Sequence, residues 1–396
     1  MRILIKNPVQ GGCTLLWVYL AATFLSFYYL LFTKTWNGDF IGRYIEMPIC
    51  GLVLVFISTV IPSLYAYYVY KYFMYKNVEL TPFPYNINLL RNITWLLFIF
   101  HILMLASGYG VMGTEGVKMS MNPLYIIRAI LIKINPRIWG MTYILVSHNP
   151  KNIVITSLLF IVSSVLAHSL GGIFTLILVL LYKYKFFLMF IKRHFILAVL
   201  GFYLLPSFVL FSYNIRGNLR GSGNMVETEY FDVILGKLCG RISSISNNGY
   251  LLENILLISM DRDNIPALFY YYDALHYFGY RPSFVSTGNY VDQNIKRTNN
   301  PNTSTMTGVF GALVMSYAVS PNVLLINLFY VLFSIPLVFY LLKKMKFSNY
   351  LGVGLFITLA YSQSGDSSEI ANAIYVLLFM WFVLSLFAKN RNEKKC

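Results

Sequence analysis

Long apolar runs constrain this chain more than any other feature of its sequence. A helix needs about 20 mostly apolar residues to cross a bilayer, and the runs of this length cover residues 13–33, 49–70, 93–112, 195–213, 322–342 and 369–388. Because 57% of the 396 residues are hydrophobic and only 12% are charged, the polar side chains cannot coat a water-soluble globule of this size. The sequence therefore predicts an all-α, polytopic membrane protein.

Shorter apolar segments raise the predicted number of transmembrane helices to about ten. Residues 152–182 are too long for one helix and are interrupted around His168 and Gly171, so two short helices that meet at a bend are expected. Residues 349–363 predict another short helix that contains glycine. Together with residues 122–147, these segments complete the set.

Residues 122–147 form the weakest predicted span, because they carry charged side chains such as Lys133 and Arg137 where lipid should be. A charge at mid-depth costs about 2.5–3.5 kcal/mol on insertion scales, so this stretch is expected to face protein or water, or to lie at the interface. Residues 306–319 are also apolar, but a full span there would make the count odd. A short re-entrant or surface-lying helix is expected instead.

The cations are distributed unevenly between the two predicted sides of the membrane. With the amino terminus inside, 17 of the 31 Lys and Arg residues fall on the inner side against two acids, which leaves +15 of the net charge of +16 there. The positive-inside rule expects this bias in short loops. Both termini are therefore predicted to be cytoplasmic, and the basic charge indicates orientation in the membrane, with no nucleic acid as partner.

This orientation divides the chain into three parts. Residues 1–213 are predicted to hold the first seven spans, and residues 322–396 the last three spans with a cytoplasmic tail. Between them, residues 214–321 are predicted to form one large loop on the outer or periplasmic side, which ends in the short helix at 306–319.

Arginine dominates the cations of the long polar stretch at residues 214–305. The stretch has eight acids and eight cations, and six of the cations are Arg216, Arg220, Arg241, Arg262, Arg281 and Arg297. The planar guanidinium binds phosphate or carboxylate oxygens in a bidentate manner, whereas lysine acts as a hydrated point charge. The arginines can bind an anionic substrate or form structural ion pairs with the loop acids, and both interpretations are open.

The arginines stand in different local settings. Arg216 and Arg220 belong to a Gly-rich segment directly after a predicted span, where guanidinium groups and backbone amides could meet a lipid-linked pyrophosphate; a simple turn is the alternative. Arg241 follows a short apolar stretch and could return to the membrane surface. Arg281 follows an aromatic run that includes His276, and such a run can stack on sugars, form an interfacial belt or fill a loop core.

Two carboxylates, Asp366 and Glu369, lie between the last two predicted spans on the outer side. Their spacing of three places them on one face of a helix start. They could act as a general base or orient a hydroxyl group, and the alternative is an N-cap with a capping-box glutamate. The sequence contains no zinc-protease, P-loop or serine-hydrolase motif and only four scattered cysteines, so no metal or other cofactor is predicted.

These features together resemble the Wzy-type O-antigen polymerases, the bacterial polymerases of oligosaccharide repeat units. The resemblance covers the layout of spans, the dominant loop, the segments 167–172, 216–223 and 240–243, and the closing carboxylates. Some members carry an arginine and a glycine with ten residues between them in such loops, a spacing that Arg297 and Gly308 share. The resemblance implies an O-antigen polymerase/ligase-like, GT-C-type architecture in the bacterial inner membrane.

The resemblance also implies the activity and the residues that perform it. The chain would be a glycosyltransferase of lipopolysaccharide biosynthesis that polymerises undecaprenyl-pyrophosphate-linked oligosaccharides, with membrane lipid and a polysaccharide chain-length regulator as further partners. The pyrophosphate ligands would be Arg216, Arg220 and Arg241. The second substrate would be bound by Arg281 or Arg297 with His276. The acceptor hydroxyl would be oriented or deprotonated by Asp366 or Glu369.

Other functions fit the same layout. A flippase or transporter of lipid-linked oligosaccharides would also be polytopic and bind pyrophosphate, but transporters usually have internal repeats and short loops, and no repeat is evident here. A ligase of the same broad group would differ only in its acceptor. A structural or receptor protein would leave the surface glycan unchanged when deleted.

Overall fold

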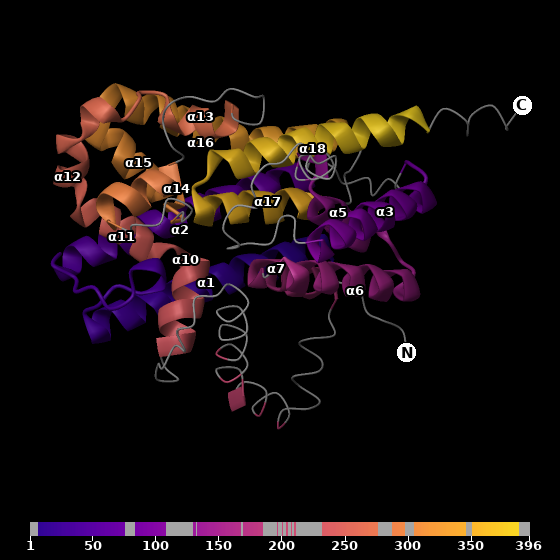
Figure 1. Cartoon of the computed structure of the whole chain (residues 1–396), viewed down its shortest axis with the longest axis horizontal. Coiled ribbons are helices and arrows are strands. Elements are labelled where there is room, and N and C mark those ends of the chain that lie inside the picture. Colours follow the sequence, from indigo (N-terminus) through magenta and orange to yellow (C-terminus); the bar gives the residue numbers. More distant parts are fainter. Residues whose placement is uncertain are drawn as a thin grey trace, which may run out of the picture.

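The computed structural model describes residues 7–75, 84–107, 130–131, 133–167, 169–184, 232–275, 287–297, 305–345 and 351–387, with six single residues between 185 and 231. These residues form helices and the turns between them, without a strand. Figure 1 shows the long helices side by side in an elongated bundle, with the short helices of residues 232–319 gathered at one end. Over these residues the predicted all-α class is confirmed.

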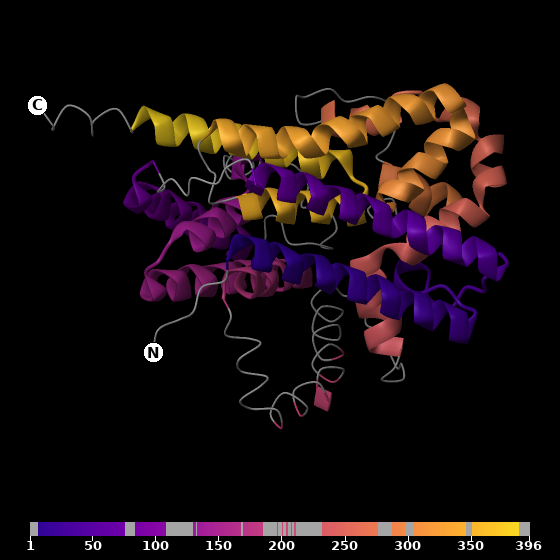
Figure 2. The same ribbon diagram turned by 180° about the vertical axis from the view of Figure 1, so that it is seen from behind.

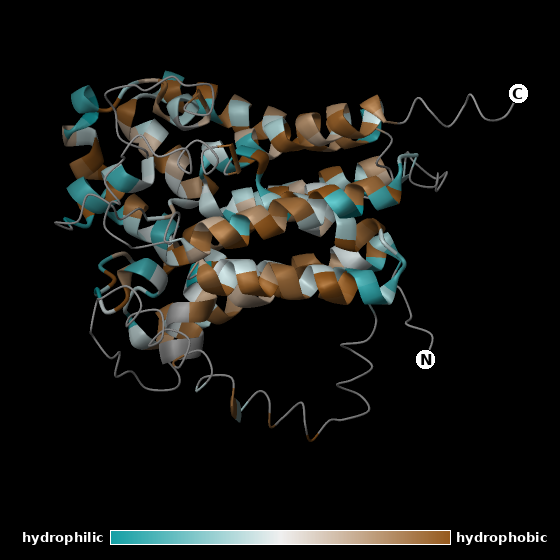
Figure 3. Ribbon diagram, turned by 45° about the vertical axis from the view of Figure 1, so that its right-hand side comes forward, coloured by the Kyte–Doolittle hydropathy of each residue, from teal (hydrophilic) through white to brown (hydrophobic). Residues whose placement is uncertain are grey.

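Five helices are long and apolar enough to cross a membrane: α1 (Pro8–Thr33), α2 (Ile49–Tyr75), α3 (Ile87–Ala106), α16 (Pro321–Lys344) and α18 (Ser367–Leu386). They match five of the six long apolar runs, and the sixth, at 195–213, lies outside the described residues except at single positions. Large apolar side chains stay exposed on their surface, among them Trp17 at 65% and Phe32 at 68%. Figure 3 shows apolar residues along the whole bundle. Such a surface suits lipid, and the chain is a membrane protein.

The predicted short helices are present where the sequence expects them. α6 (Pro150–Leu166) and α7 (Leu170–Lys183) are separate helices, which confirms that residues 152–182 do not form one helix. α17 (Leu351–Ser364) lies at the centre of the bundle, and all of its residues except Ala360 are buried. α15 (Gly308–Val319) has 12 residues, so the helix at 306–319 is short, as predicted.

The predicted span at 122–147 is wrong as a continuous helix in its described part. α5 runs only from Pro136 to Val146, because Asn135 adopts a left-handed φ of 48° and proline occupies the first helical position. Its 11 residues rise by about 16 Å, roughly half the hydrocarbon thickness. The amide of Asn135 lies 3.2 Å from that of Asn372, in the second turn of α18. Arg137 therefore sits in the first turn of a short helix that begins inside the bundle.

Several helices begin with the same local signal, an asparagine or serine followed by proline. Asn7, Asn149 and Ser320 each accept a hydrogen bond from a backbone N–H of the first turn of α1, α6 and α16, respectively. A side-chain oxygen at this position satisfies an amide that has no partner within the helix, and proline has no such amide to satisfy. These starts are thus determined locally.

Tyrosines connect one end of the bundle, which we call the basal end. The Tyr70 hydroxyl, near the end of α2, donates to Pro8 O at 2.7 Å and lies 3.0 Å from the Tyr182 hydroxyl in α7. A Cβ at Gly352 would lie 2.6 Å from the Tyr182 ring. The starts of α1 and α17 and the ends of α2 and α7 therefore meet here, as alternating spans require. In Figure 2, α1 and α2 run side by side to the opposite, apical end.

The apical end holds the first loop, residues 34–48, and a group of short helical segments. These segments are η1 (Gly38–Phe40), η2 (Asp232–Cys239), α10 (Gly240–Ser243), α11 (Ile245–Glu253), α12 (Ile255–Met260), η3 (Arg262–Asn264), α13 (Phe269–Leu275), α14 (Thr287–Tyr290) and η5 (Val291–Ile295).

Hydrogen bonds to Glu253 hold the first loop against α11. Its carboxylate accepts hydrogen bonds from Trp36 Nε1 at 2.9 Å and from the backbone N–H groups of Glu46 and Met47 at 2.6 and 2.8 Å. Trp36 is fully buried against Gly249, where a Cβ would come within 2.3 Å of the indole. The first loop is consequently part of the same folded unit as residues 240–253.

Candidate functional site

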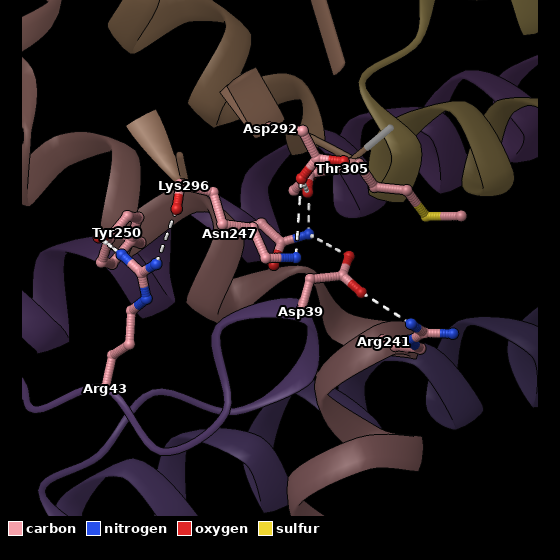
Figure 4. A network of polar contacts seen from close by, with 9 residues as sticks. Asp39, Arg43, Arg241, Asn247, Tyr250, Asp292, Lys296 and Thr305 are labelled. Carbon is pink, nitrogen blue, oxygen red and sulfur yellow. Dashed lines mark hydrogen bonds and ion pairs between the residues drawn. The ribbon is translucent and has the colours of Figure 1, made fainter. Parts of the chain in front are cut away.

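The first loop brings an aspartate into the polar centre of the apical end. Asp39 Oδ1 forms an ion pair with Arg241 Nη2 at 3.0 Å (Figure 4). The two segments can approach because Gly240 has no Cβ. A Cβ there would lie only 2.5 Å from Gly38 N, so the contact needs glycine. The Arg241 side chain is 46% exposed and that of Asp39 16%. The guanidinium is thus held by Asp39 while the side chain stays partly exposed.

A second pair of cations, Arg43 and Lys296, joins the first loop to residues 291–297. Arg43 donates to the Tyr250 hydroxyl and, at 3.0 Å, to the Lys296 carbonyl oxygen, and its guanidinium lies 5.1 Å from the centre of the Tyr250 ring. The Lys296 ammonium pairs with the buried Asp292 at 3.6 Å, and the Thr305 hydroxyl donates to the same carboxylate. These contacts, drawn in Figure 4, hold the segment in place.

Two asparagines of α11 connect the ion pair to α2 and α15. Asn247 donates to Asp39 Oδ2 at 3.3 Å and to the Met306 carbonyl oxygen at 2.5 Å. Asn248 donates to Thr59 Oγ1 in α2 at 2.7 Å and accepts from Gly311 N in α15 at 2.8 Å. Buried amides of this kind are favourable only when their partners are fixed. The start of α15 is therefore positioned by α11.

Two glycines with left-handed backbones let the α17–α18 turn touch the start of α15. Gly308 has φ 67° and Gly365 has φ 66°. A Cβ at Gly365 would lie 2.2 Å from Gly308 O, and a Cβ at Gly308 would lie 2.3 Å from Asn248 Oδ1. A larger residue at Gly365 would have to displace the backbone of Gly308, and one at Gly308 the buried Asn248 side chain. Gly308, which completes the spacing with Arg297, thus has a packing role.

A hydrogen bond places α10 beside the turn that carries the two carboxylates. The Ser244 hydroxyl, directly after α10, donates to the Gln363 carbonyl oxygen near the end of α17. The Gln363 amide is in turn hydrogen-bonded to Ser63 Oγ in α2 at 2.9 Å. Arg241 precedes this contact by three residues and Asp366 follows it by three. The structure therefore brings the Arg241 segment and the closing carboxylates into one polar region.

Asp366 and Glu369 have different roles within that region. Asp366 is the N-cap of α18, because its Oδ1 accepts from Ser368 N at 2.8 Å. A capping box would turn Glu369 back to Asp366 N, but that amide donates to Ser364 Oγ at 3.2 Å. The Ser364 hydroxyl donates instead to Glu369 Oε2 at 2.6 Å. The N-cap interpretation is confirmed for Asp366, whereas Glu369 does not close a capping box.

Glu369 combines accessibility with a position inside the protein. The residue is exposed, although its neighbours Ser364 and Ile370 are buried, and it lies close enough to Tyr19 in α1 for the two side chains to interact electrostatically. Ala360, one helical turn before Ser364, is the single exposed residue of the buried helix α17. An accessible carboxylate between α1 and α17 is the arrangement that a general base for a bound hydroxyl requires.

The structure describes half of the residues predicted for the site. Arg241, Asp366 and Glu369 lie in the apical polar region, while Arg216, Arg220, His276 and Arg281 lie outside the described residues. Arg297 is exposed, has a left-handed φ of 57° and directly follows the segment held by Arg43. Its position at the apical end is consistent with the predicted loop, and its role stays a prediction.

Sequence reasoning missed the contribution of the first loop. Asp39, Arg43 and Asn247 carry the polar centre, yet residue 39 is about 200 positions from Arg241, and no spacing rule connects them. Arg241 pairs with Asp39 of residues 34–48, an acid outside the stretch 214–305 whose eight acids were considered as partners. The two acids between the first two apolar runs, Asp39 and Glu46, were the available signal.

Metal ligands and the Cys239 thiol were also considered in the described part of the chain. No group of three or more His, Cys, Asp or Glu side chains in this part of the chain could hold a metal ion. Burial raises the pKa of the Cys239 thiol to about 11, so it stays protonated at neutral pH and is a poor nucleophile. The charged side chains that the structure describes in this region are carboxylates and cations. Comparisons with protein-family models, curated proteins and solved structures found no match to this chain.

Proposed function

We propose that the protein is an O-antigen polymerase of the Wzy type, a glycosyltransferase that joins undecaprenyl-pyrophosphate-linked oligosaccharides at the periplasmic face of the bacterial inner membrane. The observation that carries the proposal is the apical polar region of a membrane-spanning bundle, in which accessible Glu369 and Arg241 lie on segments joined by the Ser244 hydrogen bond to Gln363. A carboxylate such as Glu369 can take the proton of the acceptor hydroxyl, and a guanidinium such as Arg241 can bind the anionic leaving group.

The reaction exchanges one bond for another at the sugar. The acceptor hydroxyl oxygen forms a bond to the anomeric carbon of the growing chain, and the bond from that carbon to the lipid pyrophosphate breaks. Glu369 takes the hydroxyl proton, and the pyrophosphate leaves with the bonding electrons as an anion. Guanidinium groups such as Arg241 stabilise that anion with charge-assisted hydrogen bonds, so the leaving group needs no strong acid.

Asp39 supports this role of Arg241. A carboxylate on one side of the guanidinium restricts its orientation, and the 46% exposure of the Arg241 side chain leaves it accessible to a substrate. Arg216 and Arg220, which follow a predicted span, would complete the pyrophosphate site. Arg281 or Arg297, with His276, would bind the second substrate.

Deletion of the gene tests the proposed function. The surface glycan of the deletion strain should lose its ladder on a gel but keep a single repeat unit, and the wild-type gene should restore the ladder. A surface without any repeat would indicate a flippase or a ligase. An unchanged ladder would exclude all three activities and leave a structural role.

Arginine-to-lysine variants test the pyrophosphate site. Arg216→Lys, Arg220→Lys and Arg241→Lys keep the charge but lose the bidentate fork, and charge-assisted hydrogen bonds contribute about 1.5–3 kcal/mol. Each variant should shorten the polymer, with a roughly 10- to 100-fold slower addition of repeat units. Arg91→Lys, at the basal start of α3, is the control. Full polymer length in all three variants at normal expression would show that these arginines do not bind the pyrophosphate.

A further inference from the structure

A second cationic position lies inside the bundle, at the bend between α6 and α7. Arg137 of α5 points toward this bend, since a Cβ built on Gly172 of α7 would lie 3.4 Å from its guanidinium carbon. The Arg137 side chain is only partly accessible. Arg137 forms no ion pair with an acid among the residues that the structure describes. A cation enclosed by spanning helices without a carboxylate is costly, and it marks a functional site by default.

The side chains around Arg137 are neutral polar groups, and none of those described is a carboxylate. Ser164 is fully buried, and its Oγ has no hydrogen-bond partner in the described part of the chain. The same Cβ at Gly172 would lie 2.2 Å from Ser164 Oγ, so glycine is what allows serine and arginine to converge. His101, which is hydrogen-bonded to Ser163 Oγ at 2.9 Å, lies close enough to Arg137 to interact electrostatically.

Two helix N-termini add to the positive potential at this place. Arg137 is in the first turn of α5 and Gly172 is in the first turn of α7, and neither helix receives a capping hydrogen bond from its N-cap side chain. The dipole of each helix places partial positive charge at its N-terminus, which disfavours a cation and favours an anion there. The two N-termini therefore disfavour the arginine by itself, and an anion between them would offset that cost.

We propose that Arg137, Ser164 and the first turns of α5 and α7 form a binding site for the diphosphate of a lipid-linked substrate. The assignment to a lipid rests on the proposed function and on the location. α6 and α7 are short apolar helices of the bundle, and Val165, next to Ser164, is 54% exposed. A polymerase must hold a donor and an acceptor lipid at once, so it needs an anion site beyond that of Arg241.

Photolabelling of the purified full-length protein in detergent tests this site. The probe is a polyprenyl diphosphate with a photoreactive group, and labelled peptides are located by mass spectrometry. Wild-type protein should be labelled in residues 150–183. Excess undecaprenyl pyrophosphate should prevent the labelling, whereas undecaprenol and inorganic pyrophosphate at the same concentration should not.

Two substitutions separate binding from folding. Arg137→Gln should weaken labelling by about 10- to 100-fold, because it removes a charge-assisted pair. Ser164→Ala should weaken it several-fold and leave the melting temperature unchanged, because the hydroxyl has no partner to lose in the described structure. Arg91→Gln, remote from the bend, should label as wild type.

Three results would overturn the site. Unchanged labelling of both Arg137→Gln and Ser164→Ala would remove these residues from it. Equal competition by undecaprenol would show that only the chain is recognised, and equal competition by inorganic pyrophosphate would show a site for a soluble anion. The test does not depend on polymerisation. Normal labelling with an intact ladder in the deletion strain would refute the polymerase function and leave the site. No labelling of residues 150–183 with a lost ladder would refute the site and leave the polymerase function.

Discussion

Glu369→Gln is expected to abolish polymerisation, so that a strain with this variant shows a single repeat unit in place of the glycan ladder. Glutamine keeps the size of the side chain and can still accept the Ser364 hydrogen bond, which is 2.6 Å long, but it cannot take a proton from the acceptor. A positioned general base contributes roughly 10²- to 10⁴-fold to the rate. Repeat-unit addition by purified protein should fall by this factor, while immunoblotting of membranes should show an unchanged protein level.

Asp366→Asn is the matched control, because it also replaces a carboxylate with its amide three residues away. Asparagine caps a helix as well as aspartate does, so its oxygen can keep the hydrogen bond from Ser368 N. The variant should therefore keep the ladder and its thermal stability. Loss of the ladder in Asp366→Asn but not in Glu369→Gln would move the base to Asp366. A full ladder in both variants would show that neither carboxylate is the base.

Gly365→Ala should cause the largest loss of stability in the apical region. The alanine Cβ would lie 2.2 Å from Gly308 O, a backbone atom that cannot turn aside. An L-residue at φ 66° also costs roughly 1–2 kcal/mol, and overpacking adds about 1–3 kcal/mol. The purified protein should lose its monodisperse peak in size-exclusion chromatography after mild heating, at a clearly lower temperature than wild type. Glycan synthesis should fall with it, since the α17–α18 turn carries Glu369.

Gly42→Ala separates the clash from the backbone strain. Gly42 has a left-handed φ of 83°, but a Cβ there would meet no atom within 4 Å. This variant should carry only the backbone cost and melt close to wild type. If Gly365→Ala and Gly42→Ala lower the melting temperature equally, the close contact of Gly365 with Gly308 does not stabilise the protein.

Helix positions were predictable because the signals are local. The length of each apolar run, an Asn-Pro or Ser-Pro start and the polar interruption around His168 act within one or two helical turns. The described parts of α1, α6, α7 and α17 accordingly agree with expectation. The failure at α5 has a local cause as well, since Asn135 and Pro136 end the preceding turn. Hydrophobic character alone did not reveal that break.

The partners of the charged residues were not predictable in the same way. Arg241 pairs with Asp39, and Glu369 bonds to Ser364 and lies near Tyr19 of α1. These partners depend on how distant helices pack, and a carboxylate at position 39 has the same local sequence signal whether or not an arginine faces it. The N-cap role of Asp366 is the exception, because its partner is two residues away.

By itself, the sequence determined that the chain is a helical membrane protein with a polar, arginine-bearing part at one end, because membrane solubility depends on composition along single helices. Only the tertiary structure decided which polar groups meet. It set Asp39 against Arg241, freed Glu369 from capping and brought Arg137 to Ser164 and Gly172. The physical reason is that hydrogen bonds and ion pairs act over a few ångströms, so they are specified by packing between segments that the linear pattern does not relate.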